Sequence, residues 1–597
     1  MQARNKVPVA ETWNVHDIYP DDAAFNVDRE LYLNLVEAFI TKYTDQLKTS
    51  SDFITALGDF ELLEQKSSLL IHYAFLPQST DITDSAAAQL LRATDELLSV
   101  NAAKLTFFDD ALVNADVAIL DAIATDAPKF ASYIRHTKEK KAHQLSPDVE
   151  AALAQLSPSL YSAENTYGQV RSADLAYDPI TVNGVEYPMS FVLYENRYQY
   201  SPDTDLRRAA SKAFYDGLAK YQNTVASTYY NQVATEKRIA TLRGFDSVID
   251  YLLVGDEVDR SLFDRQIDGI MNWLAPVMRK YVNHIKEVRG LDKVTFADLQ
   301  IDLDPDFNPK VTIEESKQLV SDAISTLGAS YHDMIMPAYA ERWVDFAQNA
   351  GKESGGFATK AFGIHPYILM TWTDEMADVF TLIHELGHNG HMILSEANNS
   401  ILGDFPATYV SEAPSTFNEL LLANSLQASA DDARSKRAAL VKMLTNTYYH
   451  NFVTHLLEAA FQREVYTLID NGESFDAAKL NEIKRGVLEK FWGSDVEINN
   501  GAELTWMRQS HYYMGLYSYS YSASLTISTQ AFLKVREEGQ PAVDRWLELL
   551  KAGDQYTPVD LAAKAGVDIT TDEPLKQTIK FLDETVDQII AYTDELK

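Results

Sequence analysis

The stretch that decides the fold runs from Thr381 to His391 and reads Thr-Leu-Ile-His-Glu-Leu-Gly-His-Asn-Gly-His. Two histidines four residues apart, His384 and His388, lie on one face of a helix, so both rings can reach a single ion. Glu385 follows the first histidine, and a step of about 100° turns it toward the open side of that ion. There it can accept a proton from bound water, as in zinc-dependent peptide hydrolysis. The stretch therefore predicts a helix that carries a zinc site and a general base.

A zinc site of this kind needs three protein ligands and one open position. The third ligand is not a histidine ten residues after the first, because that position is Leu394. His391 would be crowded on the same helix turn, and we expect it to pack beside the metal rather than bind it. Glu396 and Glu412 are the downstream carboxylate candidates, and Glu412 opens a second predicted helix that would present it to the ion. Glu419 falls on the same face of that helix, where it can accept a hydrogen bond from a ligand histidine.

Composition limits the partners that the chain can have. Its 597 residues are 46% hydrophobic, which is enough for several large cores. The formal net charge of -35 argues against DNA, RNA and other polyanions. The chain has no cysteine, so histidines and carboxylates must hold any transition metal. The N-terminal residues lack an apolar segment of signal-peptide length, and no window is typical of a membrane span. We therefore expect a cytoplasmic protein without nucleic-acid or membrane partners.

The periodicity of apolar residues predicts a mostly helical chain. Apolar residues recur at three- and four-residue steps from Asp22 to about Gln169, and again from Asp203 to about Val288. Between these regions, Ile180–Tyr187 is typical of a small hairpin with Asn183-Gly184 as a type I′ turn.

Two later stretches are predicted strands: Thr295–Leu303, closed by a turn at Asp304-Pro305, and Ile364–Trp372, which is rich in β-branched and aromatic residues. Pro366 confines the second of them to a sheet edge or to the start of a strand. Thr373 and Asp374 then form the predicted N-cap of the metal-binding helix. An exposed edge of the second strand would hold an extended peptide across the metal by main-chain hydrogen bonds.

Further short motifs accompany the metal-binding stretch: Trp343-x-Asp345, Gly351-Lys352, Pro366-Tyr-Ile-Leu369 and Ser411-Glu-Ala-Pro-Ser415. Together they resemble the oligoendopeptidase F family, zinc peptidases related to thimet oligopeptidase, and the likeness extends from Trp13 over nearly the whole chain. The resemblance implies a mainly α, elongated zincin-type fold, with a small β element next to the active-site helix and a deep substrate channel. It also implies one zinc ion (Zn2+) per chain, held by His384, His388 and Glu412, with Glu385 as the general base.

The segment Ser510–Ala523 is rich in tyrosine, and its alternating Tyr and Ser residues fit a strand as well as one face of a helix. From the residues alone, a structural tyrosine cluster is the simplest interpretation. The resemblance implies instead that the segment is a flexible loop facing the zinc. There, His511 and one or more of Tyr517, Tyr519 and Tyr521 would donate hydrogen bonds to the developing oxyanion.

The predicted function is that of a metalloendopeptidase that cuts internal bonds of short oligopeptides. Two alternatives stay open: a related exopeptidase, such as a carboxypeptidase or dipeptidyl carboxypeptidase, and a non-catalytic protein that binds zinc and peptides. The first needs a group that captures the terminal charge of a peptide, and the sequence does not identify one. Glu385 argues against the second, because a structural zinc site has no use for a base. We expect a monomer or weak homo-oligomer with three segments: an N-terminal helical region (1–112), an oligopeptidase F-type helical segment with a small hairpin (113–195) and a catalytic domain (196–597).

Overall fold

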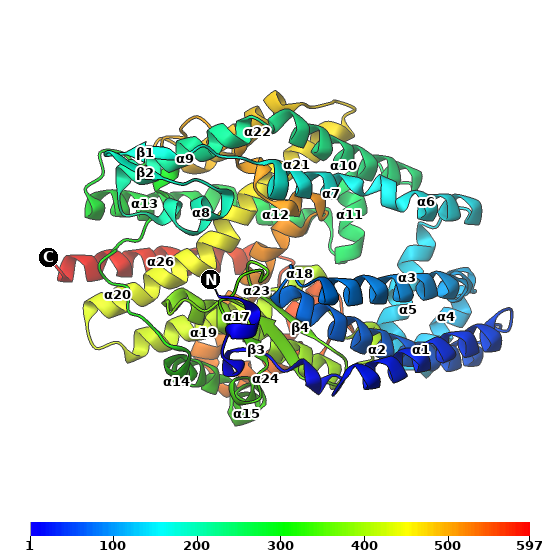
Figure 1. Ribbon diagram of the computed structural model, residues 1–597. Coiled ribbons are helices and arrows are strands. Elements are labelled where there is room, and N and C mark those ends of the chain that lie inside the picture. The colour runs from blue at the N-terminus through cyan, green and yellow to red at the C-terminus, as the bar shows by residue number, and fades with distance from the viewer. Residues whose placement is uncertain (1) are drawn as a thin grey trace.

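The computed structural model describes residues 2–597, and nearly all of its regular structure is helical (Figure 1). The helices form an elongated molecule with two halves, which lie one above the other in this view. Within residues 2–597, no helix combines the length and the apolar character that crossing a bilayer requires. The mainly α, elongated fold predicted from the sequence is confirmed.

The N-terminal helices form a layer with a core of its own. Phe39 and Phe108 are buried there, and their rings meet edge to face with centroids 5.3 Å apart. The same core takes in Tyr367 and Leu369 from a small sheet far along the chain, so this layer packs against that sheet. The helices are α1 (Asp22–Tyr43), α2 (Ser50–Thr80), α3 (Ser85–Asn114), α4 (Val117–Asp126) and α5 (Ala131–Ala142).

The next part of the chain builds most of the upper half in Figure 1. Its hairpin joins β1 (Ile180–Val182) to β2 (Val185–Tyr187), and Asn183 and Gly184 have φ angles of 51° and 80°. These left-handed angles fit the type I′ turn, so the predicted hairpin is confirmed. The helices are α6 (Pro147–Leu160), α7 (Ser162–Gln169), α8 (Phe191–Asn196), α9 (Thr204–Ala219), α10 (Gln222–Leu242), α11 (Val248–Asp256), α12 (Arg260–Gly269) and α13 (Ala275–Arg289).

The strand predicted over Thr295–Leu303 is wrong. Its first part is a short 3-10 helix, Phe296–Asp298. Asp298 is fully buried and accepts hydrogen bonds from the Thr295 backbone N–H and from the guanidinium groups of Arg207 and Arg208. The capping box of Thr295 and Asp298 satisfies the backbone locally, which removes the need for a neighbouring strand.

A three-stranded sheet lies beside the helix that carries the histidines. Its strands are β3 (Val344–Asp345), β4 (Phe357–Lys360) and β5 (Pro366–Leu369), in the order β3-β5-β4. β5 runs parallel to β3 and antiparallel to β4. Pro366 starts its strand, as predicted, but β5 is the central strand and has no free edge. The expectation that this strand receives a peptide is therefore wrong, and β4 forms the outer edge on that side.

The C-terminal part of the chain holds the remaining helices. One of them is a π-helix, η11 (Met443–Thr454), which connects two α-helices and contributes side chains to the cavity described below. The α-helices are α14 (Ile313–Ile324), α15 (Ala329–Ile335), α16 (Pro337–Ala340), α17 (Met376–Glu396), α18 (Thr408–Ser411), α19 (Ala413–Ser429), α20 (Ala433–Lys442), α21 (His455–Asp470), α22 (Ala477–Trp492), α23 (Tyr517–Glu538), α24 (Gln540–Lys551), α25 (Pro558–Lys564) and α26 (Glu573–Glu595).

Helix α17 is fixed at its start and along its length. Its N-cap is Glu375, which forms a capping box with Asp378, so the predicted caps Thr373 and Asp374 are displaced by one or two residues. Further along, a Cβ added at Gly387 would lie 2.5 Å from the Pro414 carbonyl oxygen of α19. Only glycine allows the two backbones to approach this closely, so Gly387 brings α19 against the histidine-bearing helix.

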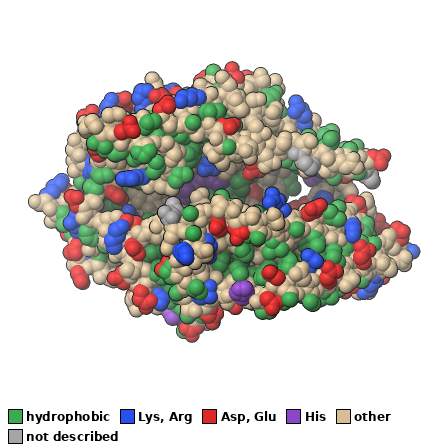
Figure 2. Space-filling model, viewed as in Figure 1, with side chains coloured by type: hydrophobic (Ala, Val, Ile, Leu, Met, Phe, Trp, Pro, Cys, Tyr) green, Lys and Arg blue, Asp and Glu red, His purple; other side chains and the backbone are tan. Residues whose placement is uncertain are grey.

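A cavity of about 920 Å³ lies between the two halves of the molecule. The space-filling view shows a hollow that runs between these halves, with histidine side chains visible inside it (Figure 2). Its lining comes from α17 and β4 in the lower half and from α22 and neighbouring segments in the upper half. The cavity corresponds to the channel expected from the sequence.

Candidate active site

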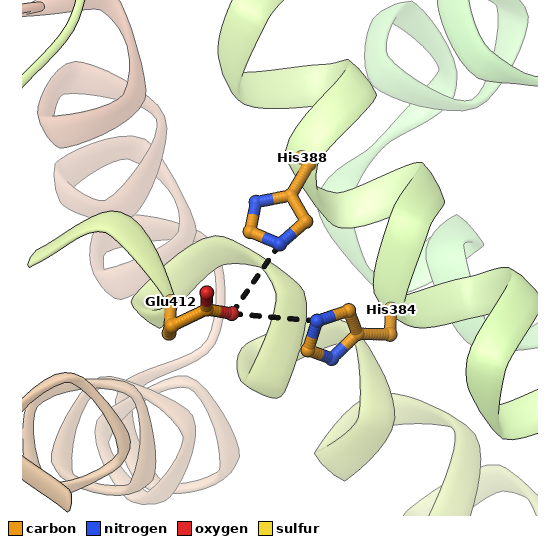
Figure 3. Close-up of side chains that lie close together, drawn as sticks. All are labelled: His384, His388 and Glu412. Carbon is orange, nitrogen blue, oxygen red and sulfur yellow. Dashed lines mark ion pairs between the residues drawn. The ribbon is translucent and has the colours of Figure 1, made fainter. Parts of the chain in front are cut away.

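Helices α17 and α19 bring three side chains together on the cavity wall. His384 and His388 project from the same face of α17, one turn apart, and Glu412 is the residue just before α19 (Figure 3). Glu412 Oε2 lies 3.3 Å from Nε2 of His384 and 3.3 Å from Nε2 of His388. The side chain of Glu412 is only 10% exposed, and both imidazoles are half-buried.

The spacing of these atoms fits a tetrahedral metal site. Zinc–nitrogen and zinc–oxygen bonds are about 2.0–2.2 Å long, and the edge of a tetrahedron with such bonds is roughly 3.3–3.6 Å. Both N–O distances from Glu412 have this length. Two imidazole nitrogens and one carboxylate oxygen are also the donor set of peptide-hydrolysing zinc sites, which leave the fourth position open. The residues present therefore fit a metal ion of this kind.

Glu385 lies beside this triangle and lines the same cavity. Glu385 is only 6% exposed, and this burial raises the pKa of its carboxyl above the ordinary value. A Cβ added at Gly356, just before β4, would lie 3.4 Å from Glu385 Oε1. The carboxylate thus sits between the metal-binding triangle and the outer strand of the sheet, where a bound peptide would pass.

Glu419 contacts Nδ1 of His384, whereas Glu412 lies near Nε2 of the same ring. His384 Nδ1 lies 2.6 Å from Glu419 Oε1, and the hydroxyl of Thr447 donates to Oε2 of the same carboxylate at 2.5 Å. Glu419 is buried, so it is not a surface carboxylate. The contact favours the tautomer with the proton on Nδ1 and leaves Nε2 free to bind a metal. His391 is also buried and lines the cavity, and burial lowers its pKa to about 3, so it is neutral.

The negative charge of Glu419 orients His384 and makes its ring more basic. We expect Glu419→Gln, which removes this charge, to weaken metal binding by about 10- to 100-fold. The affinity can be measured by competition with a coloured chelator. Glu464→Gln is a matched control, since Glu464 is exposed on α21 and should leave the affinity unchanged. An unaltered affinity in Glu419→Gln would contradict this role for Glu419.

The Tyr-rich segment begins helix α23, and the structure brings only part of the predicted set to the cavity. Tyr517 and Tyr521 are one turn apart, and both line the cavity. The Tyr517 hydroxyl donates to Glu412 Oε1 at 3.3 Å. His511 lies just behind, with its ring stacked 5.6 Å from that of Tyr517. Its Nδ1 is 3.7 Å from Glu458 Oε2, too far for a hydrogen bond.

Tyr519 is not brought to the site. It is fully buried, packs against Phe263 and Tyr409, and donates its hydroxyl to Asp256 Oδ2 at 2.8 Å. Residues two positions apart on a helix point about 200° away from each other, so Tyr519 faces away when Tyr517 and Tyr521 face the cavity. The predicted oxyanion role of Tyr519 is therefore not supported by its placement.

A buried histidine–carboxylate cluster behind the tyrosines has no counterpart among the sequence predictions. His455 Nδ1 lies 2.8 Å from Glu458 Oε2, and its Nε2 lies 3.0 Å from Nε2 of His450. The ring of Tyr521 stacks on His455 with centroids 4.1 Å apart. Burial opposes ionisation of Glu458, but the neighbouring His455 imidazole holds the pKa of this carboxyl well below its ordinary value. In the sequence, the close spacing of His450, His455 and Glu458 is the feature that could have indicated this cluster.

The fold and the site together define a class of protein. A mainly helical chain that places a His-Glu-x-x-His helix and a second-helix glutamate on a deep cavity is a metal-dependent peptidase. Residues 197–581 match the family model described as Peptidase family M3, and residues 112–177 match the one described as Oligopeptidase F. The chain belongs to peptidase family M3. The resemblance stated from the sequence motifs is confirmed.

Relatives match over nearly the full length of the chain. Oligopeptidase PepF of Bacillus subtilis is 27% identical over 98% of this chain and 88% of its own length. An oligoendopeptidase F homolog of Lactococcus lactis is 24% identical over 98% of each chain. A solved structure from Chlamydophila abortus has a TM-score of 0.85 at 21% identity and covers 99% of this chain and 100% of its own. The oligoendopeptidase-F structure from Enterococcus faecium has a TM-score of 0.73 at 20% identity, covering 96% and 99%. These structural matches show the shared fold.

Proposed function

We propose that the protein is a zinc-dependent endopeptidase that hydrolyses internal bonds of short peptides. The observation that carries this proposal is the triangle of His384, His388 and Glu412, with Glu385 beside it, on the wall of a cavity of about 920 Å³. The names of the relatives, oligopeptidase and oligoendopeptidase, support the same substrate class and the same mode of cleavage.

In the proposed reaction, Glu385 moves one proton. Zinc, when bound, would lower the pKa of a water molecule and polarise the scissile carbonyl. Glu385 accepts a proton from the attacking water while the water oxygen bonds to the carbonyl carbon. Glu385 then gives that proton to the nitrogen as the carbon–nitrogen bond breaks. Its buried position favours this exchange, because the raised pKa of the carboxyl lets it hold a proton between the two steps.

The other polar groups position the reactants. Tyr517 and Tyr521 are the hydroxyl donors that line the cavity near Glu412, so they are assigned to the carbonyl oxygen as it gains negative charge. His511 is assigned a supporting role beside them, because its ring lies against Tyr517 and Tyr521. Glu419 keeps His384 in the tautomer that binds metal.

Strand β4 is the proposed support for the substrate backbone. It is one of the two edge strands of the sheet, and its residues Phe357 and Ala358 line the cavity together with the preceding Gly356. A peptide that adds to this edge is held by main-chain hydrogen bonds, which do not depend on its sequence. The cavity of about 920 Å³ between the halves suits a short extended peptide better than a folded domain. These features favour short peptides as substrates.

A panel of peptides with both ends blocked tests the proposal. We expect cleavage at internal bonds, with activity lost by at least about 100-fold on chelation and restored by zinc. Mass spectrometry of the products locates each cut. Cleavage of unblocked peptides alone, one or two residues at a time, would favour the exopeptidase alternative. Zinc binding without any hydrolysis would favour the non-catalytic alternative. The three-segment division and the monomeric or weakly oligomeric state stay predictions.

A further inference from the structure

The upper wall of the cavity carries two cations that the reaction does not use. Lys484 lies on α22 and Arg508 follows the short helix Ala502–Met507, and both line the cavity. Figure 1 places α22 in the upper half and the metal-binding helix α17 in the lower half. Lys484 therefore belongs to the half that faces α17 across the cavity, and Arg508 contacts Glu195 of α8 (Phe191–Asn196) in the same half.

Lys484 is deeply buried, yet its ammonium group makes few hydrogen bonds. The residue is 2% exposed, and its Nζ donates one hydrogen bond, to the Leu457 carbonyl oxygen at 3.2 Å. An ammonium group has three N–H donors, so two make no hydrogen bond, although Nζ also lies over the Phe461 ring, 5.6 Å from its centroid. Within residues 2–597, no carboxylate lies within 4.0 Å of this Nζ. Glu458 acts on Lys484 only at longer range, and its carboxylate receives hydrogen bonds from His455 and Ser518 instead.

Two other lysines, whose side chains are 3% and 8% exposed, behave differently. The Nζ of Lys352 donates to the Asp345 carboxylate at 2.7 Å and also reaches the main-chain oxygens of Ala347 and Met370. Lys360 pairs with Glu396. Both lysines are structural, with an anion already in contact. Among these three lysines, Lys484 alone lines the cavity and has no ion-pair partner in the described residues.

The ammonium group of Lys484 keeps its positive charge at neutral pH. Burial lowers the pKa of Lys484 to about 8, with Glu458 opposing the change, so most molecules keep the ammonium protonated. Arg508 is held in place by Glu195, whose Oε1 accepts from Nε at 3.1 Å and from Nη2 at 2.8 Å. Glu195 and Glu458 line the same wall, so its net charge is not positive, and Lys484 supplies the cation without an ion-pair partner there, in a chain whose overall charge of -35 repels acidic ligands at the surface.

We propose that Lys484 anchors an anion-binding subsite that takes a carboxylate of the peptide substrate, with Arg508 adding positive potential beside it. The inference rests on the proposed peptidase function and names what its substrates must carry. A peptide offers a carboxylate either at its C-terminus or on an Asp or Glu side chain. Either one would fill the free donor positions of Lys484 and satisfy its buried charge.

The test compares matched peptides on the zinc-loaded enzyme. One pair has a free C-terminal acid or a C-terminal amide, and a second series exchanges Glu for Gln at each position of an otherwise identical quenched fluorescent peptide. We expect one carboxylate to raise kcat/KM about tenfold over its neutral counterpart in the wild type. The arm in which this difference occurs identifies the source of the carboxylate.

Variants then assign the preference to Lys484. Lys484→Met removes the charge at similar volume and should bring the ratio of kcat/KM for charged over neutral peptide close to one, whereas Lys484→Arg should keep most of it. Lys490→Met is the matched control, because Lys490 is exposed on the same helix and its charge faces solvent. A preference that survives in Lys484→Met would overturn the assignment.

The wild-type arm alone can also overturn the proposal, even if Lys484→Met does not fold. Equal cleavage of charged and neutral peptides at every position would mean that no anion subsite exists. That result differs from failure of the proposed function, in which no peptide is cut at all in the presence of zinc.

Discussion

Replacing Glu385 by Gln is expected to lower kcat by about 10²- to 10⁴-fold while leaving the metal bound. Gln has nearly the same size, so it can occupy the same buried place beside His384 and His388, but it cannot accept a proton from water. His384 and Glu412 do not depend on Glu385 for their positions, because Glu419 contacts His384 and Ser415 contacts Glu412. The rate is measured with an end-blocked peptide, and the metal content of the same sample by elemental analysis.

The metal content is what makes this experiment decisive. A purified Glu385→Gln protein with a full complement of metal and near wild-type turnover would refute the role of Glu385 as the base. A protein that lost both metal and activity would show that Glu385 contributes to binding the metal. Thermal unfolding of the variant, compared with that of the wild type, checks that the helix is intact.

Replacing Asp345 by Leu is expected to destabilise the protein by about 3–5 kcal/mol, because it leaves the buried ammonium of Lys352 and the partly exposed guanidinium of Arg4 without their partner. Asp345 is fully buried on β3. Its Oδ1 accepts from Lys352 Nζ at 2.7 Å and from Arg4 Nη1 at 2.9 Å. Lys352 lies in the turn before β4, so the loss also loosens the strand that faces the cavity. Chemical denaturation followed by circular dichroism measures the change.

Asp333→Leu serves as the control for this substitution. The side chain of Asp333 is 79% exposed and contacts only His332, at 3.1 Å, among ionic groups. A surface change of this kind is worth about 0.5 kcal/mol or less. Equal unfolding midpoints for Asp345→Leu and the wild type would mean that the buried ion pairs do not stabilise the sheet.

The sequence predicts the metal-binding part of the site well because local spacing determines it. The four-residue step between His384 and His388 needs only a helix to bring the rings together. The position of Glu412 is harder to predict from the sequence, because it depends on how α19 packs against α17. That packing follows from Gly387, whose missing side chain admits the backbone of Pro414.

The parts that sequence reasoning misses depend on long-range contacts. Periodicity could not tell which of the alternating tyrosines faces the cavity, because a strand and a helix put Tyr519 on different sides. Thr295–Leu303 has strand-like composition, but Arg207, 91 positions before Asp298, pairs with that residue and stabilises a turn instead. Lys484 gives no local signal at all. Its position in the cavity wall becomes evident only when α22 is packed in place.

The central position of β5 has a consequence for how selectivity can change among such enzymes. Because both edges of β5 are paired, β4 is the edge strand whose residues line the cavity and can bind a ligand by main-chain hydrogen bonds. Main-chain hydrogen bonds at this edge do not depend on the side chains of the peptide, and β4 lies in the same half as the metal-binding helix α17. Choice among peptides then falls to side chains of the other half, such as Lys484. The metal-binding triangle and Lys484 thus lie in separate halves, so substitutions at Lys484 can change preference while the metal ligands stay in place.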